Sequence, residues 1–343
     1  MAWQNVRGHD RIASELGQCL AQGRLPHALL FVGPEGIGKR TFALALAQAL
    51  LCETAPEGAL EACGKCPGCV QVKGGAHPDF MMVERPEDKH ELPISVIRDL
   101  TGDLSLKPAR GRRKVAIVND AEALSEEAAN AFLKTLEEPP PGSVLIMIAS
   151  SAESQLETVV SRCRVVRFEP LPEADLAALL LEQEATTDPA EAARLAALGE
   201  GSLARALGLA DPALAEFRRA LIDDLAQPGG FDAPALARRL DAFAKEAGKE
   251  SVDQRARARL LVGELARLFR ATLWQTAGIE PPWPDPSDLT AVRRLAQHLD
   301  PEDVLVLADR CLEADYQIHR RVYLPLVLEA LTCDLGRLVN PRG

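Results

Sequence analysis

A glycine-rich loop that ends in lysine carries the clearest chemistry in this sequence. Residues 33–40 read G-P-E-G-I-G-K-R and fit the phosphate-loop pattern G-x-x-x-x-G-K. The backbone amides of such a loop cradle phosphate oxygens, and its lysine neutralises their charge. The pattern predicts a nucleotide site made of Gly33, Pro34, Gly36, Gly38, Lys39, Arg40, Thr41 and the more distant Asp120.

The metal ligand expected directly after the lysine is missing. Ser or Thr normally holds Mg²⁺ at that position, whereas Arg40 offers only hydrogen-bond donors. Thr41 is adjacent, but one residue on a helix lies about 100° further round, so it is a poor substitute. Two interpretations stay open: the loop binds ATP or ADP and hydrolysis is not expected, or the loop is vestigial and binds nothing.

A second motif has lost its chemistry in the same way. The apolar run at residues 114–119 is followed by Asp120, which is suited to hold a metal-bound water. A hydrolytic ATPase of this type carries its general base directly afterwards, where Ala121 has no proton-accepting group. Glu122 is one residue further on and is a less suitable base. The sequence therefore keeps a nucleotide-binding framework and lacks the groups for hydrolysis.

Four of the eight cysteines crowd into one short segment. Cys63, Cys66 and Cys69 form two successive C-x-x-C steps, and Cys52 supplies a fourth thiolate. Zinc favours tetrahedral sulfur ligation in closed structural sites. Free thiols or a disulfide are the plain alternative, although a cytosolic disulfide is disfavoured. An iron–sulfur cluster uses the same ligands. We expect structural zinc that staples a loop at residues 52–69, inserted after the phosphate-loop helix.

Two further groups of cations could meet phosphate. Arg162 lies in the triplet Ser161-Arg162-Cys163, where a lone arginine most simply forms a surface ion pair. Residues 107–114 hold five basic side chains in eight positions. A solvated loop before a strand is the favoured interpretation of that stretch, and contact with phosphate is the alternative.

Short apolar runs alternate with helical patterns through the first half of the chain. Strands are expected at 27–32, 79–84, 114–119, 143–150 and 165–168, separated by helices that include 10–21, 39–51 and 93–106. Ser125 is placed to cap a further helix, whose first turn carries two glutamates. Alternating strands and helices predict a parallel α/β sheet covered on both faces.

The pattern changes near residue 171, after which only helices are expected. The predicted division is an α/β domain at 1–170, a small helical domain of three short helices at 171–210, and an all-α domain at 211–343. Breaks are expected at 228–230 and 280–284, and Pro325 should kink or interrupt the last helix.

Composition limits the possible functions. The chain has 343 residues with 47% hydrophobic but only 4% aromatic residues, which favours helices and a buried parallel sheet over a β-sandwich. A net charge of -11 argues against a protein whose whole surface grips nucleic acid. The N-terminus lacks an apolar signal region, and no stretch is long enough to span a membrane. A cytoplasmic protein without membrane contact is expected.

With these residues assembled, the chain resembles bacterial clamp-loader subunits of the AAA+ class. Four stretches carry the resemblance: residues 33–39, the four clustered cysteines, residues 130–140 (N-A-F-L-K-T-L-E-E-P-P), and residues 161–163 (S-R-C). Together these motifs cover roughly residues 25–170, and the helical remainder agrees in class but carries little motif of its own.

The resemblance implies an ATPase-like α/β domain, a helical lid and a C-terminal helical collar. In the family, the arginine of S-R-C acts in trans on ATP held by a neighbouring subunit, and Arg162 matches that position. The implied partners are ATPase subunits of the tau/gamma type and a delta subunit, and through their complex the sliding clamp and primer-template DNA. The implied cofactors are structural zinc and, in the loop, ATP or ADP.

Three departures from the family pattern distinguish its subunits. Hydrolysing members have Thr or Ser at Arg40, Glu at Ala121, and Arg at Ala204 in the lid's sensor segment, where Arg205 is one residue off and points elsewhere. These departures favour a non-motor subunit without intrinsic ATPase activity. The alternatives are an ATP-hydrolysing motor subunit and, from another class, a zinc-stapled nucleic-acid-binding module.

Overall fold

The structure is a computed structural model that describes residue 3 and residues 6–56, 58–86, 89–110, 112–227, 230–281 and 286–340. The chain forms two compact units. The first comprises Met1–Leu179 with Glu200–Ala204, and the second comprises Leu180–Gly199 with Arg205–Gly343. The chain therefore enters the second unit at residue 180, returns to the first for five residues, and leaves it again at Arg205.

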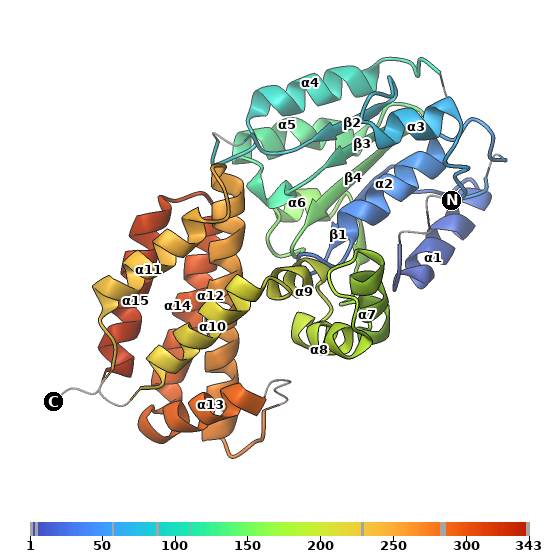
Figure 1. Cartoon of the computed structure of the whole chain (residues 1–343). Coiled ribbons are helices and arrows are strands. Elements are labelled where there is room, and N and C mark those ends of the chain that lie inside the picture. The colour runs from blue at the N-terminus through green and yellow to red at the C-terminus, as the bar shows by residue number, and fades with distance from the viewer. Residues whose placement is uncertain are drawn as a thin grey trace. The chain divides into compact units, whose positions relative to one another are not determined.

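A five-stranded parallel sheet forms the centre of the first unit (Figure 1). Its spatial order is β2-β3-β4-β1-β5, so β1 pairs with two strands that come much later in the chain. Leu30, for example, lies between Met147 of β4 and Val165 of β5. The strands are β1 (Ala28–Val32), β2 (Phe80–Val83), β3 (Lys114–Val118), β4 (Ser143–Ala149) and β5 (Arg164–Arg167).

The three central strands, β1, β3 and β4, are buried along their whole length. Alternate side chains point to opposite faces of a strand, and here the two sets enter two separate cores. Leu29 and Phe31 belong to the core under α1 (Asp10–Ala21) and α2 (Lys39–Leu50). Leu30 and Val32 belong to the core under α4 (Ile94–Ser105) and α5 (Glu126–Glu137). Figure 1 shows these two helix pairs on opposite sides of the sheet.

Local signals account for several helix ends in this unit. Ser125 caps α5, since its hydroxyl accepts a hydrogen bond from the amide of Ala128 at 3.1 Å, as predicted. Asp120 has φ 58°, which turns the chain sharply after β3. The elements that the sequence did not predict are short: α3 (Pro67–Lys73), the 3₁₀ turn η2 (Ala121–Ala123) and α6 (Glu157–Val160).

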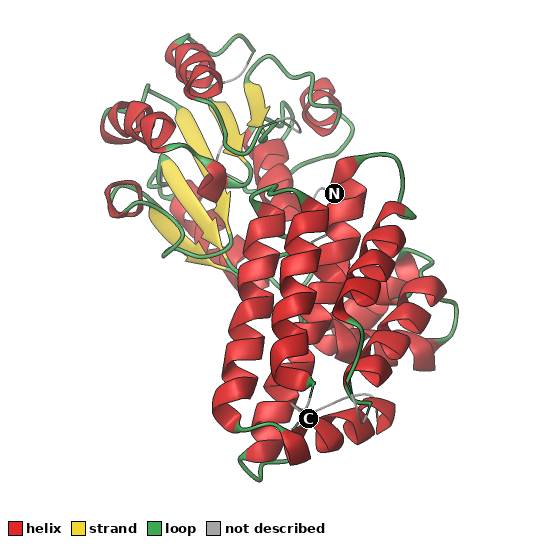
Figure 2. Cartoon of the chain, turned by 90° about the vertical axis from the view of Figure 1, so that its left-hand side faces the viewer, coloured by secondary structure: helices red, strands yellow, loops and turns green. Residues whose placement is uncertain are grey.

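The second unit contains only helices in the part of it that the structure describes, and Figure 2 shows its long helices side by side. Three short helices span the region from 171 to 210, as predicted, and α7 and α9 each cross from one unit to the other. These helices are α7 (Glu173–Glu182), α8 (Pro189–Gly199), α9 (Leu203–Leu209), α10 (Pro212–Leu225), α11 (Ala233–Lys245), α12 (Ser251–Thr276), α13 (Pro286–His298), α14 (Pro301–His319) and α15 (Leu324–Val339).

The prediction for Pro325 was wrong. The proline lies in the first turn of α15, where its missing N–H has no helical partner to lose, so the helix begins there and is not kinked. Helices end before and begin after both predicted breaks, whose residues 228–229 and 282–284 lie outside the described residues.

The predicted fold class is confirmed: a parallel α/β sheet with a phosphate loop after its first strand, followed by an all-helical remainder. Among the described residues, no helix is both long and apolar enough to cross a membrane. The three-domain division at residues 170 and 210 stays a prediction.

Candidate functional site

The glycine-rich loop joins β1 to α2, which is the place where a phosphate loop belongs. Gly33, Gly36 and Gly38 all have positive φ, at 149°, 76° and 96°. A Cβ on Gly36 would lie 2.3 Å from the hydroxyl oxygen of Ser202. Glycine at this position is therefore required both by backbone conformation and by the close packing of a segment 166 residues away.

The loop is held from its carbonyl side. Five successive carbonyl oxygens, from residue 33 to residue 37, each accept a hydrogen bond, two from the loop's own Lys39 and three from other segments of the first unit. The loop conformation is thus fixed by the protein itself, and its amide side is what a phosphate would meet. The donors are Lys39 Nζ to Gly33 and to Pro34 (2.6 Å), Ser202 Oγ to Glu35 (2.9 Å), Leu203 N to Gly36 (2.9 Å) and His9 Nε2 to Ile37 (2.7 Å).

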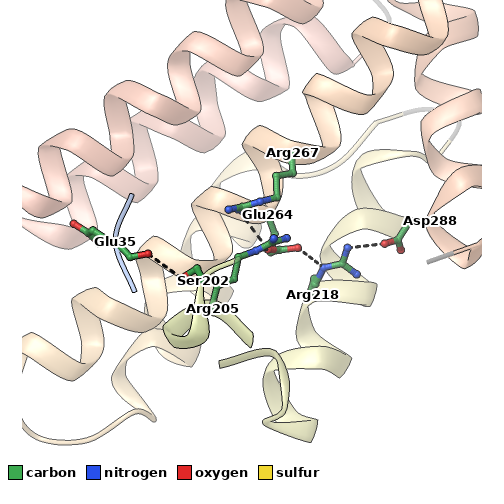
Figure 3. Close-up of polar contacts among 7 residues, drawn as sticks. All are labelled: Glu35, Ser202, Arg205, Arg218, Glu264, Arg267 and Asp288. Atoms are coloured by element: carbon green, nitrogen blue, oxygen red, sulfur yellow. Dashed lines mark hydrogen bonds and ion pairs between the residues drawn. The ribbon is translucent and has the colours of Figure 1, made fainter. Parts of the chain in front are cut away.

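Two of these donors come from the G-S-L-A-R segment at 201–205. Ser202 and Leu203 lie within the first unit, and Figure 3 shows the Ser202 hydroxyl reaching the backbone of Glu35. The family resemblance pointed to this segment through the position of Ala204. The hydroxyl and the amide that actually hold the loop have no distinctive sequence pattern and could be found only in the fold.

Lys39 is buried, and its ammonium group donates to two carbonyls of its own loop. Burial lowers the pKa of Lys39, while the negative charges of Glu35 and Glu122 oppose that shift. An ammonium group held at the centre of the loop is suited to neutralise phosphate oxygens.

Arg40 is engaged in an ion pair at the position where a hydrolytic loop carries its metal ligand. Its Nη2 lies 2.5 Å from Oε1 of Glu84, which follows β2, and 3.9 Å from the sulfur of Met82. Thr41 is exposed on α2. The guanidinium group can only donate hydrogen bonds, so it brings no oxygen ligand for Mg²⁺.

The three residues after Asn119, which follows β3, are also poorly suited to ATP hydrolysis. The carboxylate of Asp120 is paired with Nη2 of Arg85 at 2.9 Å, and both side chains are largely buried. Ala121 is buried and has no functional group. Oε1 of Glu122 accepts a hydrogen bond from the amide of Ser150 at 3.1 Å. Through this hydrogen bond Glu122 holds the chain just after the end of β4.

The four clustered cysteines converge as predicted. Sγ of Cys52 lies 3.9 Å from Sγ of Cys66, Sγ of Cys63 lies 4.0 Å from Sγ of Cys69, and all four sulfurs lie within 4.8 Å of one another. A disulfide would need about 2.05 Å, and these cysteines are free. Four sulfurs about 2.3 Å from a central tetrahedral zinc would be about 3.8 Å apart. The donor set therefore fits structural zinc.

Backbone amides support the thiolate form within this cluster. The amides of Lys65 and Cys66 lie 3.4 and 3.2 Å from Sγ of Cys63, and the amide of Cys69 lies 3.4 Å from Sγ of Cys66, which caps α3. A hydrogen bond from Thr54 and these amides lower the pKa of Cys63 to about 5, whereas burial raises the pKa of Cys69. A thiolate is the form that binds metal.

The stretch at 107–114 is anchored by an acid that the sequence did not single out. Asp79, fully buried just before β2, accepts hydrogen bonds from the amides of Ala109 (2.6 Å) and Arg110 (2.8 Å). Nη1 of Arg110 in turn contacts Gln71 of α3 (3.1 Å) and Glu53 (4.0 Å). Arg110 therefore contacts the cysteine segment. The stretch is largely exposed and leads into β3, which agrees with the favoured interpretation of a solvated loop before a strand. Gly111 in this stretch lies outside the described residues.

Arg162 lies between α6 and β5 and is partly exposed. Its Nε and Nη2 both donate to Oε1 of Glu137, at 2.8 and 2.5 Å. Its Nη1 donates to the carbonyl of Thr158 and the hydroxyl of Ser161. The neighbouring Cys163 packs against the core under α5, and burial raises the pKa of its thiol to about 11. Arg162 is thus a fixed cation at the surface of the first unit.

Arg205 points away from nucleotide chemistry, as predicted. In the second unit its Nε donates to Oε1 of Glu264 at 2.8 Å, and Nε of Arg218 donates to Oε2 of the same carboxylate at 2.7 Å. Nη2 of Arg218 reaches Asp288 at 2.5 Å, and Arg267 approaches Glu264 at 3.6 Å. Figure 3 shows this chain of charges linking α9, α10, α12 and α13. Sequence reasoning missed Glu264 and Asp288, because only the fold brings them to these arginines.

The fold and the loop together define an α/β phosphate-loop protein whose loop lacks a metal ligand. Residues 8–172 match a sequence family described as DNA polymerase III, delta subunit. This match covers just under half of the chain, and it bears out the resemblance on which the sequence interpretation depended.

Named relatives have similar descriptions. The subunit delta' of DNA polymerase III from Pseudomonas aeruginosa is 40% identical over 177 residues, which are 51% of this chain and 53% of that protein. The subunit delta' from Escherichia coli is 36% identical over 187 residues, 54% of this chain and 55% of that protein. The subunit tau from Escherichia coli is 33% identical over 215 residues, 62% of this chain and 33% of that protein. The chain thus spans about half the length of the delta' relatives that it matches.

Among solved structures, a gamma-subunit-related protein from Thermotoga maritima superposes with a TM-score of 0.43. It is 17% identical in sequence, and the superposition covers 95% of this chain and 99% of that one.

Proposed function

We propose that this chain is a non-motor subunit, of the delta-prime type, of the replicative clamp loader of DNA polymerase III. It assembles through its helical C-terminal region with a delta subunit and with ATPase subunits of the tau/gamma type. The assembly opens the sliding clamp and places it on primer-template DNA in the cytoplasm, powered by ATP that the neighbouring subunits hold. The chain itself does not hydrolyse ATP.

The observation that carries this proposal is the ion pair between Arg40 and Glu84 beside the loop lysine. Magnesium held by a Ser or Thr hydroxyl is part of phosphoryl transfer in phosphate-loop enzymes. A guanidinium group in that place supplies a fixed charge and no ligand. Ala121 in place of a general base and the ion-paired Asp120 support the same conclusion.

Arg162 gives the chain a catalytic role in a neighbour's site. A cation that reaches the γ-phosphate from an adjacent subunit can accelerate hydrolysis by orders of magnitude. Arg162 is a partly exposed, well-held cation in the S-R-C triplet, and these features suit a group that acts across an interface.

Zinc has a structural role in this proposal. Four protein thiolates complete a tetrahedral shell and leave no open position for substrate. Cys52, Cys63, Cys66 and Cys69 would hold the ion, which would fix the turn between Cys52 and Cys63 beside the N-cap of α3. A zinc-stapled nucleic-acid-binding module is disfavoured, because the chain carries a net charge of -11.

The motor subunit is the second candidate, because the tau relative matches over more residues than either delta' relative. The two candidates make opposite predictions for ATP hydrolysis by the isolated chain. A motor subunit would hydrolyse ATP, and the Lys39→Ala variant would lose that activity. A delta-prime-type subunit would show no turnover in either form.

The test compares steady-state ATP hydrolysis by the isolated chain and by the reconstituted clamp loader with clamp and primed DNA. Arg162→Ala is the variant, and Arg164→Ala is its matched control, since Arg164 is an exposed arginine two residues away. We expect the isolated chain not to hydrolyse ATP. In the reconstituted complex, we expect Arg162→Ala to lower ATP turnover at the site that Arg162 completes by on the order of tenfold or more. Robust turnover by the isolated chain would establish the motor subunit instead.

A further inference from the structure

The guanidinium group of Arg162 is held by several hydrogen bonds, two of them to Glu137. Of the five N–H groups of a guanidinium, four of those on Arg162 donate within the first unit: two to Oε1 of Glu137, one to the carbonyl of Thr158 and one to the hydroxyl of Ser161. One N–H on Nη2 is left without an acceptor among the described residues. The guanidinium plane is therefore fixed while one edge stays available to an outside anion.

The position of Glu137 does not stabilise its own helix, α5. It is the last residue of α5, and Glu138 follows it directly as the C-cap. The C-terminal end of a helix carries partial negative charge, so two carboxylates there are electrostatically unfavourable. The cation of Arg162 compensates this charge at Glu137. For Glu138 no polar side-chain contact is found among the described residues, which makes it a natural control.

A free arginine side chain would have to lose rotamer freedom at the moment it meets an anion. The contacts with Glu137 and Thr158 remove most of that freedom in advance. Misplacement of a reacting group by about 1 Å can reduce a rate by about a hundredfold. Fixing the guanidinium beforehand therefore acts on the rate of the chemical step.

We infer that Glu137 is a positioning residue for Arg162, acting on ATP hydrolysis in the neighbouring subunit without touching the nucleotide itself. The inference rests on the proposed trans role of Arg162. Glu137 holds the partly exposed arginine at the end of α5 and leaves one N–H of Nη2 without an acceptor among the described residues. Because the pair lies at the surface, with side-chain exposures of 32% for Arg162 and 52% for Glu137, its removal should cost little stability.

The test uses the reconstituted clamp loader with clamp and primed DNA, in which turnover is measured at varied ATP concentration. The Arg162-dependent turnover is the difference between wild type and Arg162→Ala. We expect Glu137→Ala to lower that turnover about tenfold, with the ATP concentration for half-maximal rate unchanged within about twofold. Glu137→Gln keeps an acceptor of the same shape and should recover part of the loss, while Glu138→Gln should match wild type.

A double-mutant cycle separates positioning from a merely structural effect. If Glu137 acts through Arg162, then Glu137→Ala has no further effect in the Arg162→Ala background. An equal loss in both backgrounds would overturn the inference, and so would a Glu137→Ala variant with wild-type turnover. Wild-type turnover of Arg162→Ala itself would instead overturn the proposed trans role, and the inference with it.

Discussion

Nη2 of Arg40 lies 2.5 Å from Oε1 of Glu84, so the residue directly after the loop lysine is joined to the end of β2. The same position in a hydrolytic phosphate loop carries a hydroxyl that ligates Mg²⁺. The pair therefore places an internal charge contact where a hydrolytic loop carries a metal ligand.

Nucleotide binding should accordingly be insensitive to magnesium. We expect wild-type affinity for ATP, measured by isothermal titration calorimetry, to agree within about twofold with and without Mg²⁺, since Arg40 supplies no oxygen ligand. Arg40→Thr should gain about tenfold in affinity when Mg²⁺ is present. Glu84→Gln is the control, because it removes the ion pair but keeps the arginine. A strong magnesium dependence in the wild-type chain would contradict this account of the loop.

The cysteine cluster should bind one zinc ion per chain. Metal analysis of purified protein should give one equivalent, and Cys66→Ser should lose it, because its sulfur lies 3.9 Å from that of Cys52 within the closed set. Cys333→Ser, at an exposed cysteine outside the cluster, should keep the metal. If the purified protein contains iron and absorbs visible light, the cluster is an iron–sulfur cluster and the zinc prediction is wrong. No metal of either kind would reduce the cluster to free thiols.

Glu264 should be among the most sensitive positions of the second unit. The side chain is 1% exposed and lies between two buried arginines. Removing one partner of a buried ion pair typically costs about 3–5 kcal/mol, so Glu264→Gln should lower the free energy of unfolding by about that much in urea titrations. Glu329→Gln, at an exposed glutamate on α15, should change it by less than about 0.5 kcal/mol. Equal stability of the two variants would show that the charge network is dispensable.

The same carboxylate predicts a pH dependence. Burial alone would raise the pKa of Glu264, but Arg205 and Arg218 hold it below its ordinary value of 4.5. A carboxyl whose pKa is lower in the folded protein stabilises the fold above the unfolded pKa and loses that contribution as pH falls through the folded value. The stability difference between wild type and Glu264→Gln should therefore be full near neutral pH and shrink below about pH 4.5. A constant difference across that range would contradict a titrating ion pair.

Assembly should depend on an apolar stripe along α14. Leu305, Leu312 and Tyr316 are spaced by seven and four residues, so they share one helix face, and they are 49%, 60% and 62% exposed. If the C-terminal helices hold the complex together, Leu312→Asp should weaken assembly by at least about tenfold in analytical ultracentrifugation, because a charge would then be buried without a partner. Ile279→Asp, also at an exposed apolar position of the second unit, is the control. Undisturbed assembly would place the interface elsewhere.

The local elements were predictable because their signals are local. The five predicted strands differ from the observed ones by no more than one residue at either end, since buried parallel strands are short apolar runs bounded by turn residues. The cap at Ser125 and the start of α2 after Gly38 follow from chemistry within a few residues. Pro325 shows the limit of such reasoning: the same residue ends or begins a helix, and neighbouring packing decides which.

The sequence by itself determined which groups are present: a phosphate loop without a metal ligand, four cysteines in metal-binding spacing, and an arginine in the S-R-C triplet. Only the tertiary structure decided what holds them. It placed Ser202 and Leu203 on the loop carbonyls, Glu137 on Arg162, Asp79 under the basic stretch, and Glu264 between two arginines. These partners are separated by 25 to 167 residues along the chain. A contact of that kind depends on strand order and helix packing, which are properties of the whole folded unit and leave no periodic signal in the sequence.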